Sequence, residues 1–381
     1  MIINLTDTQS SQIASALLKA RRNLGNASGM VLTLLVAAEQ RTYKKVFEAS
    51  RVAAREHPSR LILVVNTTGK TTKLDAEIHL AEDVPGEVIV LLLSGELREH
   101  PDSAVLPLLL PDSPVVMWWP AASPEKPALD ALGKLASRRI TDASGDSSPL
   151  KALQVRAQNH VPGDTDLVWT RLTPWRALLA AALDQYPTRV TGATVAAARQ
   201  NAPADLMAAW LESRLGVDVV RKNSAGPGIT AVTLETPGGP VVVAREDGVT
   251  ASYAIPGQPR RVVALKRRDV NELLTEELRR MDADDIYEES LRVLLKRASL
   301  KPAKDAGASV LDELSEPLEP VPAAPRRRGT SAAARDRAVA ATHQRSTKES
   351  KPRTRKAPSA KKQGDEPKTP EQGVDSTASE G

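Results

Sequence analysis

The first 120 residues alternate short apolar runs with segments of helical periodicity. Each run is six or seven residues long, which is the length of a strand and too short to cross a membrane. Continuous apolar runs of this kind are typical of strands that are buried on both faces. Strands interleaved with helices predict a mixed α/β sheet. The predicted strands are residues 31–36, 60–65, 74–80 and 87–93.

The run at 74–80 alternates apolar and polar residues more strictly than the others. We therefore expect it at an edge of the sheet or with one face in solvent. The helix between the first two strands carries Tyr43 and Phe47 on one side, and it should end at His57 because the residue before a proline is excluded from the α region. Ahead of these elements, Asp7 is a candidate N-cap for a first helix that ends before Gly25.

The middle of the chain predicts several short elements. Thr173 and Pro174 form a helix-start signal, because threonine caps helices and proline suits their first position. Trp175, Leu179 and Leu183 then fall on one helical face. The other elements expected here are helices at 104–110, 130–136 and 150–157 and a strand at 139–141.

From about residue 186 the pattern changes to closely spaced strands. Pro237, Gly238 and Gly239 form a tight hairpin signal between two of them. Two helices, one around Leu273 and one around Leu291, are expected to finish this unit. We expect an antiparallel meander flanked by helices, with a helix at 203–215 and strands at 217–221, 230–235, 240–244, 249–254 and 261–265.

The last sixty residues lack the apolar side chains that a folded core requires. From Pro322 onward the only large aliphatic residues are Val339 and Val374. This segment holds fourteen Lys or Arg against seven Asp or Glu, whereas the preceding body has a net charge of −2. The basic pI of 9.3 is therefore due to this segment.

The predicted fold class is α/β, with mixed sheets flanked by helices in two domains. We expect an N-terminal α/β domain at 1–185, a C-terminal α+β domain at 186–300 and a disordered basic tail at 301–381.

The residue inventory excludes several classes of chemistry. The chain has no cysteine, which removes disulfides, zinc thiolates and thiol catalysis and fits a reducing, cytoplasmic compartment. Its five histidines show no metal-ligand spacing and no dinucleotide fingerprint is present, so we expect no metal and no cofactor. Residues 66–72 are not a phosphate-binding loop, because Val64 stands where the first glycine is required. The first residues lack the basic and apolar segments of a signal peptide.

Residues 162–176 hold the densest group of candidate binding side chains: two carboxylates, two tryptophans and two arginines. Arginine forks bind phosphate or carboxylate, and Trp with Arg dominates many interfaces, so a ligand or partner site is one interpretation. The other is a structural corner, which spacing alone favours. In that interpretation Trp169 and Trp175 are core residues and Asp166 pairs with Arg171.

Two further segments carry aromatic and cationic groups, which would form one surface with residues 162–176 if the segments converge. Trp118 and Trp119 are adjacent on a strand and so point to opposite faces, which requires that the second be covered by another layer or by a partner. Arg138 and Arg139 follow close behind them. The candidate partner- or ligand-binding residues are Trp118, Trp119, Arg138, Arg139, Asp164, Asp166, Trp169, Arg171, Trp175 and Arg176.

Three of these segments together carry a family resemblance. Residues 115–120, 132–142 and 162–180 are similar, in sequence, order and spacing, to signature segments of the OpcA family of glucose-6-phosphate dehydrogenase assembly proteins. His57 to Arg60, which lead into a strand, are similar as well, and the resemblance covers about residues 1–301. One departure concerns control by cysteines, which is associated with photosynthetic relatives and is impossible in a chain that has none.

The resemblance implies a non-catalytic partner that binds glucose-6-phosphate dehydrogenase, favours its active oligomer and supports NADPH supply in the oxidative pentose phosphate pathway. A sugar-phosphate or nucleotide-sensing regulatory protein is the alternative. An enzyme would instead use Asp164 and Asp166 as acid and base, with Arg171 and Arg176 on a sugar phosphate. We expect no specific nucleic acid as a partner, because the basic tail lacks aromatic residues for base stacking. We also expect no membrane, because the apolar runs are too short to span a bilayer.

Overall fold

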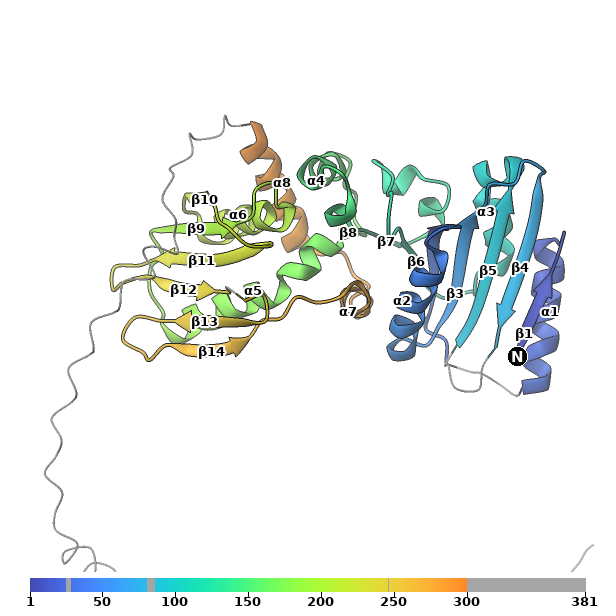
Figure 1. The fold of residues 1–381 in the computed structure, drawn as a ribbon, viewed down its shortest axis with the longest axis horizontal. Helices are drawn as coiled ribbons and strands as arrows, with labels where there is room; N and C mark the ends of the chain where they lie inside the picture. The colour runs from blue at the N-terminus through green and yellow to red at the C-terminus, as the bar shows by residue number, and fades with distance from the viewer. Residues whose placement is uncertain (25–28, 81–85, 246, 300–381) are drawn as a thin grey trace, which may run out of the picture. The chain divides into compact units, whose positions relative to one another are not determined.

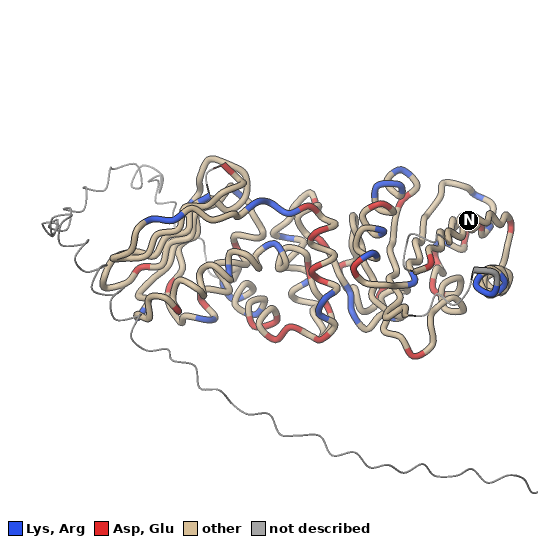
Figure 2. The backbone as a smooth tube through the Cα atoms, turned by 90° about the horizontal axis from the view of Figure 1, so that it is seen from below, with Lys and Arg blue, Asp and Glu red and all other residues tan. Residues whose placement is uncertain are grey.

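The computed structural model describes residues 1–24, 29–80, 86–245 and 247–299, and it confirms a mixed α/β fold with two sheets flanked by helices (Figure 1). The predicted disordered tail at 301–381 lies outside the described residues, as does Gly25. Within the described ranges, no helix is both long enough and apolar enough to span a membrane. Lys and Arg are interspersed with Asp and Glu along the backbone (Figure 2).

The first sheet has eight strands in the order β1-β4-β5-β3-β2-β6-β7-β8. β4 is antiparallel to its neighbours β1 and β5, and the other pairs are parallel. The alternation at 74–80 reflects a solvent-facing side and not an edge position, because β1 pairs with the outer side of β4. The strands are β1 (Ile2–Leu5), β2 (Leu32–Glu39), β3 (Ser59–Asn66), β4 (Lys73–His79), β5 (Gly86–Ser94), β6 (Val115–Trp118), β7 (Arg138–Thr141) and β8 (Asp164–Asp166).

Helices pack on both faces of the first sheet. α1 (Ser10–Leu24) shares one apolar core with Trp119, and α2 (Tyr43–Glu56) shares the core of the other face with Trp118. The two tryptophans therefore lie on opposite faces, as the two-residue period of a strand requires. α2 ends before His57, as predicted from the following proline.

The predicted start of α1 is wrong, because the helix begins at Ser10 and not after Asp7. Asp7 has a φ of 48°, and its backbone N–H donates to Asp75 Oδ1 at 2.8 Å. The residue thus belongs to a turn held against β4. At the true start, Gln12 Oε1 accepts from the backbone N–H of Gln9 at 3.0 Å, which satisfies one of the donors that a helix start leaves free.

Residues 130–136 do not form the predicted α-helix. Pro127–Leu129 and Gly133–Leu135 are short 3-10 turns. The carboxylate of Asp130 accepts from two backbone N–H groups at 3.0 and 3.1 Å, a local pattern that competes with helical hydrogen bonds. The helix expected at 104–110 is α3 (Pro101–Val105), which gives way to a further 3-10 turn.

The second sheet has six strands in the order β10-β9-β11-β12-β13-β14. The hairpin between β11 and β12 is as predicted, but a simple antiparallel meander is not, because β9 was missed and pairs in parallel with β10. β9 is rich in alanine, which carries little strand signal but lets α6 pack closely on the sheet. The strands are β9 (Gly192–Ala197), β10 (Val219–Asn223), β11 (Ile229–Glu235), β12 (Val241–Ala244), β13 (Thr250–Ala254) and β14 (Arg261–Ala264).

Four helices share a core with the second sheet: α4 (Pro149–Gln158), α5 (Leu167–Gln185), α6 (Ala202–Leu215) and α8 (Asp285–Ser299). α7 (Val270–Glu277) behaves differently, because Leu273 and Leu274 join the core of α2 and the first sheet. The predicted division of the body at residue 185 stays a prediction.

Candidate functional site

The segment with the densest candidate side chains begins as β8 and continues directly into α5. Asp166 is the N-cap of α5, and its Oδ1 accepts from the backbone N–H of Val168 at 2.9 Å. The predicted helix start at Thr173 and Pro174 is therefore wrong. Pro174 lies well inside α5.

Pro174 is tolerated inside the helix because another group satisfies the carbonyl that it leaves free. A proline has no N–H to donate to the carbonyl four residues earlier, which here belongs to Thr170. The Nη2 atom of Arg268 donates to that carbonyl at 2.7 Å. Arg268 also pairs with Glu276 of α7. Its side chain therefore joins the proline-containing part of α5 to α7 and to the segment that precedes α7.

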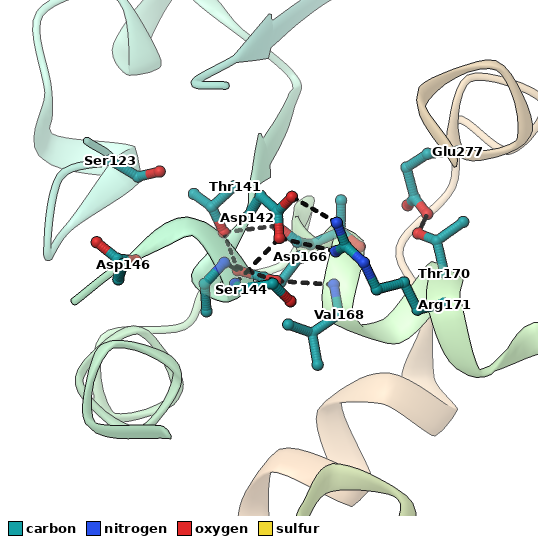
Figure 3. Close-up of polar contacts among 12 residues, drawn as sticks. Ser123, Thr141, Asp142, Ser144, Asp146, Asp166, Val168, Thr170, Arg171 and Glu277 are labelled. Carbon is teal, nitrogen blue, oxygen red and sulfur yellow. Dashed lines mark hydrogen bonds and ion pairs between the residues drawn. The ribbon is translucent and has the colours of Figure 1, made fainter. Parts of the chain in front are cut away.

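Asp166 is fully buried where β7 and β8 end (Figure 3). Its carboxylate accepts from Thr141 Oγ1 at 2.6 Å, from the Ala143 backbone N–H at 3.1 Å and from Arg156 Nη1 at 3.3 Å. Burial, and then the neighbouring charge of Asp142, raises the pKa of Asp166 above its ordinary value. The oxygens of Asp166 are occupied by internal donors, and the group does not reach solvent.

The predicted pair of Asp166 and Arg171 is wrong. Arg171 forks onto Asp142 instead, with Nη1 2.7 Å from Oδ1 and Nη2 2.8 Å from Oδ2 (Figure 3). Residues five apart do not face each other on a helix, so the N-cap carboxylate cannot meet this arginine. The Arg171 side chain keeps 25 % of its surface exposed, whereas that of Asp142 keeps 8 %.

Arg138 and Arg139 are adjacent on β7, and both are buried. Arg138 donates to the Glu277 carboxylate and to the backbone carbonyl of Asp282 at 2.7 Å. Arg139 pairs with Asp164 and donates to two backbone carbonyls. The buried guanidinium groups of Arg138 and Arg139 therefore each have a carboxylate partner, which offsets the cost of burying a charge.

Glu277 joins three elements. Its second carboxylate oxygen accepts from Thr170 Oγ1 (Figure 3). Because the first oxygen accepts from Arg138, one side chain of α7 contacts both β7 and α5. His57 Nε2 lies 2.9 Å from the carbonyl oxygen of Thr275, which adds a contact between α7 and the end of α2.

The tryptophans of α5 are core residues, in agreement with the structural-corner interpretation. Trp169 Nε1 donates to Asp284 Oδ2 at 2.9 Å, and the Arg176 guanidinium lies 3.5 Å from the centre of a Trp169 ring. Burial lowers the pKa of Arg176 to about 10, so this group keeps its charge at neutral pH. Trp175 is 2 % exposed in the core of the second sheet.

The structure thus places most of the candidate residues in the interior, although it brings all those of residues 138–176 into one connected region. Seven are buried: Trp118, Trp119, Arg138, Arg139, Asp166, Trp169 and Trp175. Asp164, Arg171 and Arg176 are partly exposed. The role of all ten in binding a partner or ligand stays a prediction.

Several residues that complete this region carried no local signal in the sequence. Glu277 and Asp284 lie more than a hundred residues from the side chains of β7 and α5 that they bind, so no spacing rule points to these contacts. Thr141 and Arg156 resemble ordinary strand and helix residues until β8 places Asp166 beside them. Over the described ranges, no three His, Asp or Glu side chains are arranged to hold a metal ion.

The fold and this region define a class of protein: a two-sheet α/β protein whose buried arginine–carboxylate pairs join β7 to α7 and to β8. Residues 50–158 match the family model described as the glucose-6-phosphate dehydrogenase subunit N-terminal domain. Residues 162–291 match the model described as the C-terminal domain of the same subunit. The two matches together cover more than half of the chain, which belongs to the OpcA family.

Two curated cyanobacterial proteins, both provisionally named OxPP cycle protein OpcA, are similar to this chain. The protein of Synechococcus elongatus is 30 % identical over 186 residues, and that of a Synechocystis species is 30 % identical over 169 residues. The first match covers 44 % of this chain and 42 % of the relative, and the second covers 40 % and 35 %. The chain therefore spans about two fifths or less of the length of these relatives. Among solved structures, an oxidoreductase domain protein from Kribbella flavida has a TM-score of 0.43 and 8 % identity, over 71 % of this chain and 97 % of that chain.

Proposed function

We propose that this chain is a non-catalytic assembly partner of glucose-6-phosphate dehydrogenase. It binds the dehydrogenase in the cytoplasm, favours its active oligomer and thereby supports NADPH production in the oxidative pentose phosphate pathway. The observation that carries the proposal is the match of residues 50–158 and 162–291 to the two domains of a glucose-6-phosphate dehydrogenase subunit.

The state of the candidate acid–base residues supports a non-catalytic role. A general acid or base must be within hydrogen-bond reach of a substrate. Asp166 is 0 % exposed and accepts from internal donors, and Asp164 is held by Arg139 and by the backbone N–H of Val161 at 3.1 Å. Neither carboxylate is free to exchange a proton with a bound sugar.

Assembly needs no chemistry from this chain. A protein that binds only the active oligomer shifts the equilibrium toward it by the difference between its affinities for the two states. A preference of about 1.4 kcal/mol changes the oligomer equilibrium tenfold. That preference is within the range of a few polar contacts at an interface.

The partly exposed candidates are the first residues to test at the interface. Arg171 is held by Asp142, so its guanidinium is presented in a fixed orientation with a quarter of the side chain open to a partner. Arginine in such a position is a common centre of binding energy. Arg189 is an exposed arginine outside this region and serves as a matched control.

The test is a sizing experiment on the dehydrogenase of the same organism with and without this chain, followed by dehydrogenase activity of each fraction. We expect a larger co-eluting species with higher activity. Arg171→Ala should weaken co-elution and Arg189→Ala should not. Folded proteins that elute separately, with no change in activity, would falsify the proposal.

A further inference from the structure

A cavity of about 270 Å³ lies beside Pro174, where α5, the N-terminal end of α6, β11, β12 and the segment after β14 meet. Among the residues that the structure describes, its lining contains five basic side chains and no acidic one. The basic residues are Arg171, Arg245, Lys266, Arg267 and Arg268.

Three of the five charges are balanced by nearby carboxylates. Arg171 forks onto Asp142, Lys266 Nζ lies 2.6 Å from Glu272 Oε1, and Arg268 pairs with Glu276. In the part of the chain that the structure describes, no carboxylate pairs with Arg245 or with Arg267. Two cations that have no carboxylate partner among the described residues therefore line the cavity.

Arg245 is held rigidly but is not neutralised. It is 8 % exposed, and its Nη1 and Nη2 atoms donate to the backbone carbonyls of Leu265 at 2.9 Å and Ile229 at 3.4 Å. Its Nε is a buried donor that has no hydrogen-bond partner among the described residues, and such unsatisfied buried donors are uncommon and costly. Burial, together with the charge of Arg267, lowers the pKa of Arg245 to about 10, so the group remains a cation at neutral pH.

The negative charge of Asp247 acts on Arg245 and offsets part of its positive charge, but no ion pair joins the two side chains. Its carboxylate accepts from the backbone N–H groups of Val249 and Thr250 at 2.8 and 2.7 Å, and from Thr250 Oγ1 at 2.6 Å. These are loop contacts within the turn before β13. Asp247 is thus occupied by its own turn and makes no ion pair with Arg245.

The two unpaired guanidinium groups converge on Gly228, whose φ is +76°. A Cβ atom at this position would lie 2.9 Å from Nη2 of Arg267 and 4.0 Å from Nη2 of Arg245. The lack of a side chain at position 228 therefore lets the Arg267 guanidinium lie close to the backbone there, near that of Arg245. Asn201 and Pro203 at the start of α6 line the same cavity, and the partial positive charge of a helix N-terminus adds to the attraction for an anion.

We propose that this cavity binds a small phosphate monoester, with Arg245 and Arg267 on the phosphate oxygens. A phosphate monoester carries a charge of about −1.5 to −2 at pH 7, which matches two unpaired cations, whereas a single carboxylate would leave one of them unbalanced. Guanidinium forks suit phosphate geometry. The small volume favours a compact phosphorylated metabolite, such as a sugar phosphate, over a whole dinucleotide. The site does not depend on the proposed binding of the dehydrogenase.

The experiment is calorimetric titration of the full chain with inorganic phosphate, glucose 6-phosphate, NADP and glucose at constant ionic strength. We expect saturable binding of glucose 6-phosphate and phosphate and none of glucose. NADP should bind more weakly than glucose 6-phosphate. Arg267 is exposed, and within the described ranges its side chain makes no ion pair, so Arg267→Gln should fold and should lower the affinity about tenfold to a hundredfold. Arg189→Gln is the matched control and should bind like the wild type.

A wild-type chain without saturable phosphate binding would overturn the proposal, and so would an Arg267→Gln variant that binds normally. Arg245→Gln gives a second test if circular dichroism shows that it folds. Loss of dehydrogenase co-elution in Arg267→Gln, without phosphate binding by the wild type, would assign the cavity to the protein interface and refute a metabolite site. Phosphate binding without any co-elution would refute only the proposed function.

Discussion

The guanidinium of Arg268 donates a 2.7 Å hydrogen bond to the backbone carbonyl of Thr170, the carbonyl that Pro174 leaves without its helical donor. The contact joins α5 to the segment before α7. It accounts for a proline in the interior of a buried helix, where the loss of a hydrogen bond and the clash of the ring cost about 3 kcal/mol.

We predict that Arg268→Ala lowers the free energy of unfolding by about 1.5–3 kcal/mol, because the Thr170 carbonyl loses a charged donor. In a Pro174→Ala background the same substitution should cost less, since the alanine introduced there supplies the missing backbone N–H. Urea denaturation of the four proteins measures this coupling. Glu276→Gln removes only the partly exposed ion pair of Arg268 and should cost about 0–1 kcal/mol. Equal costs for Arg268→Ala in both backgrounds would contradict the role assigned to it.

Glu277 should be among the most sensitive positions in the protein. Glu277→Ala leaves the buried Arg138 guanidinium without its carboxylate and Thr170 without its acceptor. Loss of one partner of a buried ion pair typically costs about 3–5 kcal/mol. Glu289→Ala, which breaks the exposed pair with Arg214, should cost less than about 1 kcal/mol. Thermal unfolding of both variants compares the two losses of stability. Similar transition temperatures would contradict the stabilising role assigned to Glu277.

Gly163 fixes the approach of β8 to β7. Its φ is +93°, and a Cβ atom would lie 2.3 Å from the backbone oxygen of Ser137 and 3.1 Å from Nη2 of Arg139. Gly163→Ala should therefore destabilise the fold by more than about 1 kcal/mol. Gly145 has open space around it, so Gly145→Ala should be tolerated. In urea, Gly163→Ala should unfold at a lower midpoint concentration than Gly145→Ala. The reverse order would refute this account of Gly163.

His160 should make stability depend on pH. Burial lowers its pKa below the ordinary value of 6.5, against the attraction of Asp164, so the unfolded chain binds a proton more readily than the folded one. Its contribution is present above the unfolded pKa and is lost as the pH falls through the folded pKa. The free energy of unfolding should thus fall more steeply between pH 7 and pH 5 in the wild type than in His160→Gln. Parallel curves for the two proteins would contradict this.

Local periodicity was sufficient to predict much of the fold. The strands at 31–36, 60–65 and 87–93 and the opposite orientations of Trp118 and Trp119 follow from apolar runs and the two-residue period of a strand. β9 was missed because its alanines resemble a helix in isolation, and only the packing of α6 makes small residues favourable there.

The candidate region was harder to predict, because its partners are distant in the sequence. The motif of Thr173 and Pro174 resembles a helix start, and only Arg268 makes an interior proline tolerable. Asp166 and Arg171 were paired by proximity along the chain, whereas in the fold Asp166 pairs with Arg156 of α4 and Arg171 pairs with Asp142, which follows β7. Arg245 and Arg267 stood in segments without any motif, and their convergence on Gly228 is a property of the folded sheet alone.

The most direct test of the proposed function is dehydrogenase activity measured over a dilution series of the enzyme, with and without a saturating amount of this chain. If the chain favours the active oligomer, the enzyme concentration at half-maximal specific activity should fall at least tenfold, and the activity at high concentration should stay the same. An unchanged half-maximal concentration would contradict the account, whether or not the maximal activity changed.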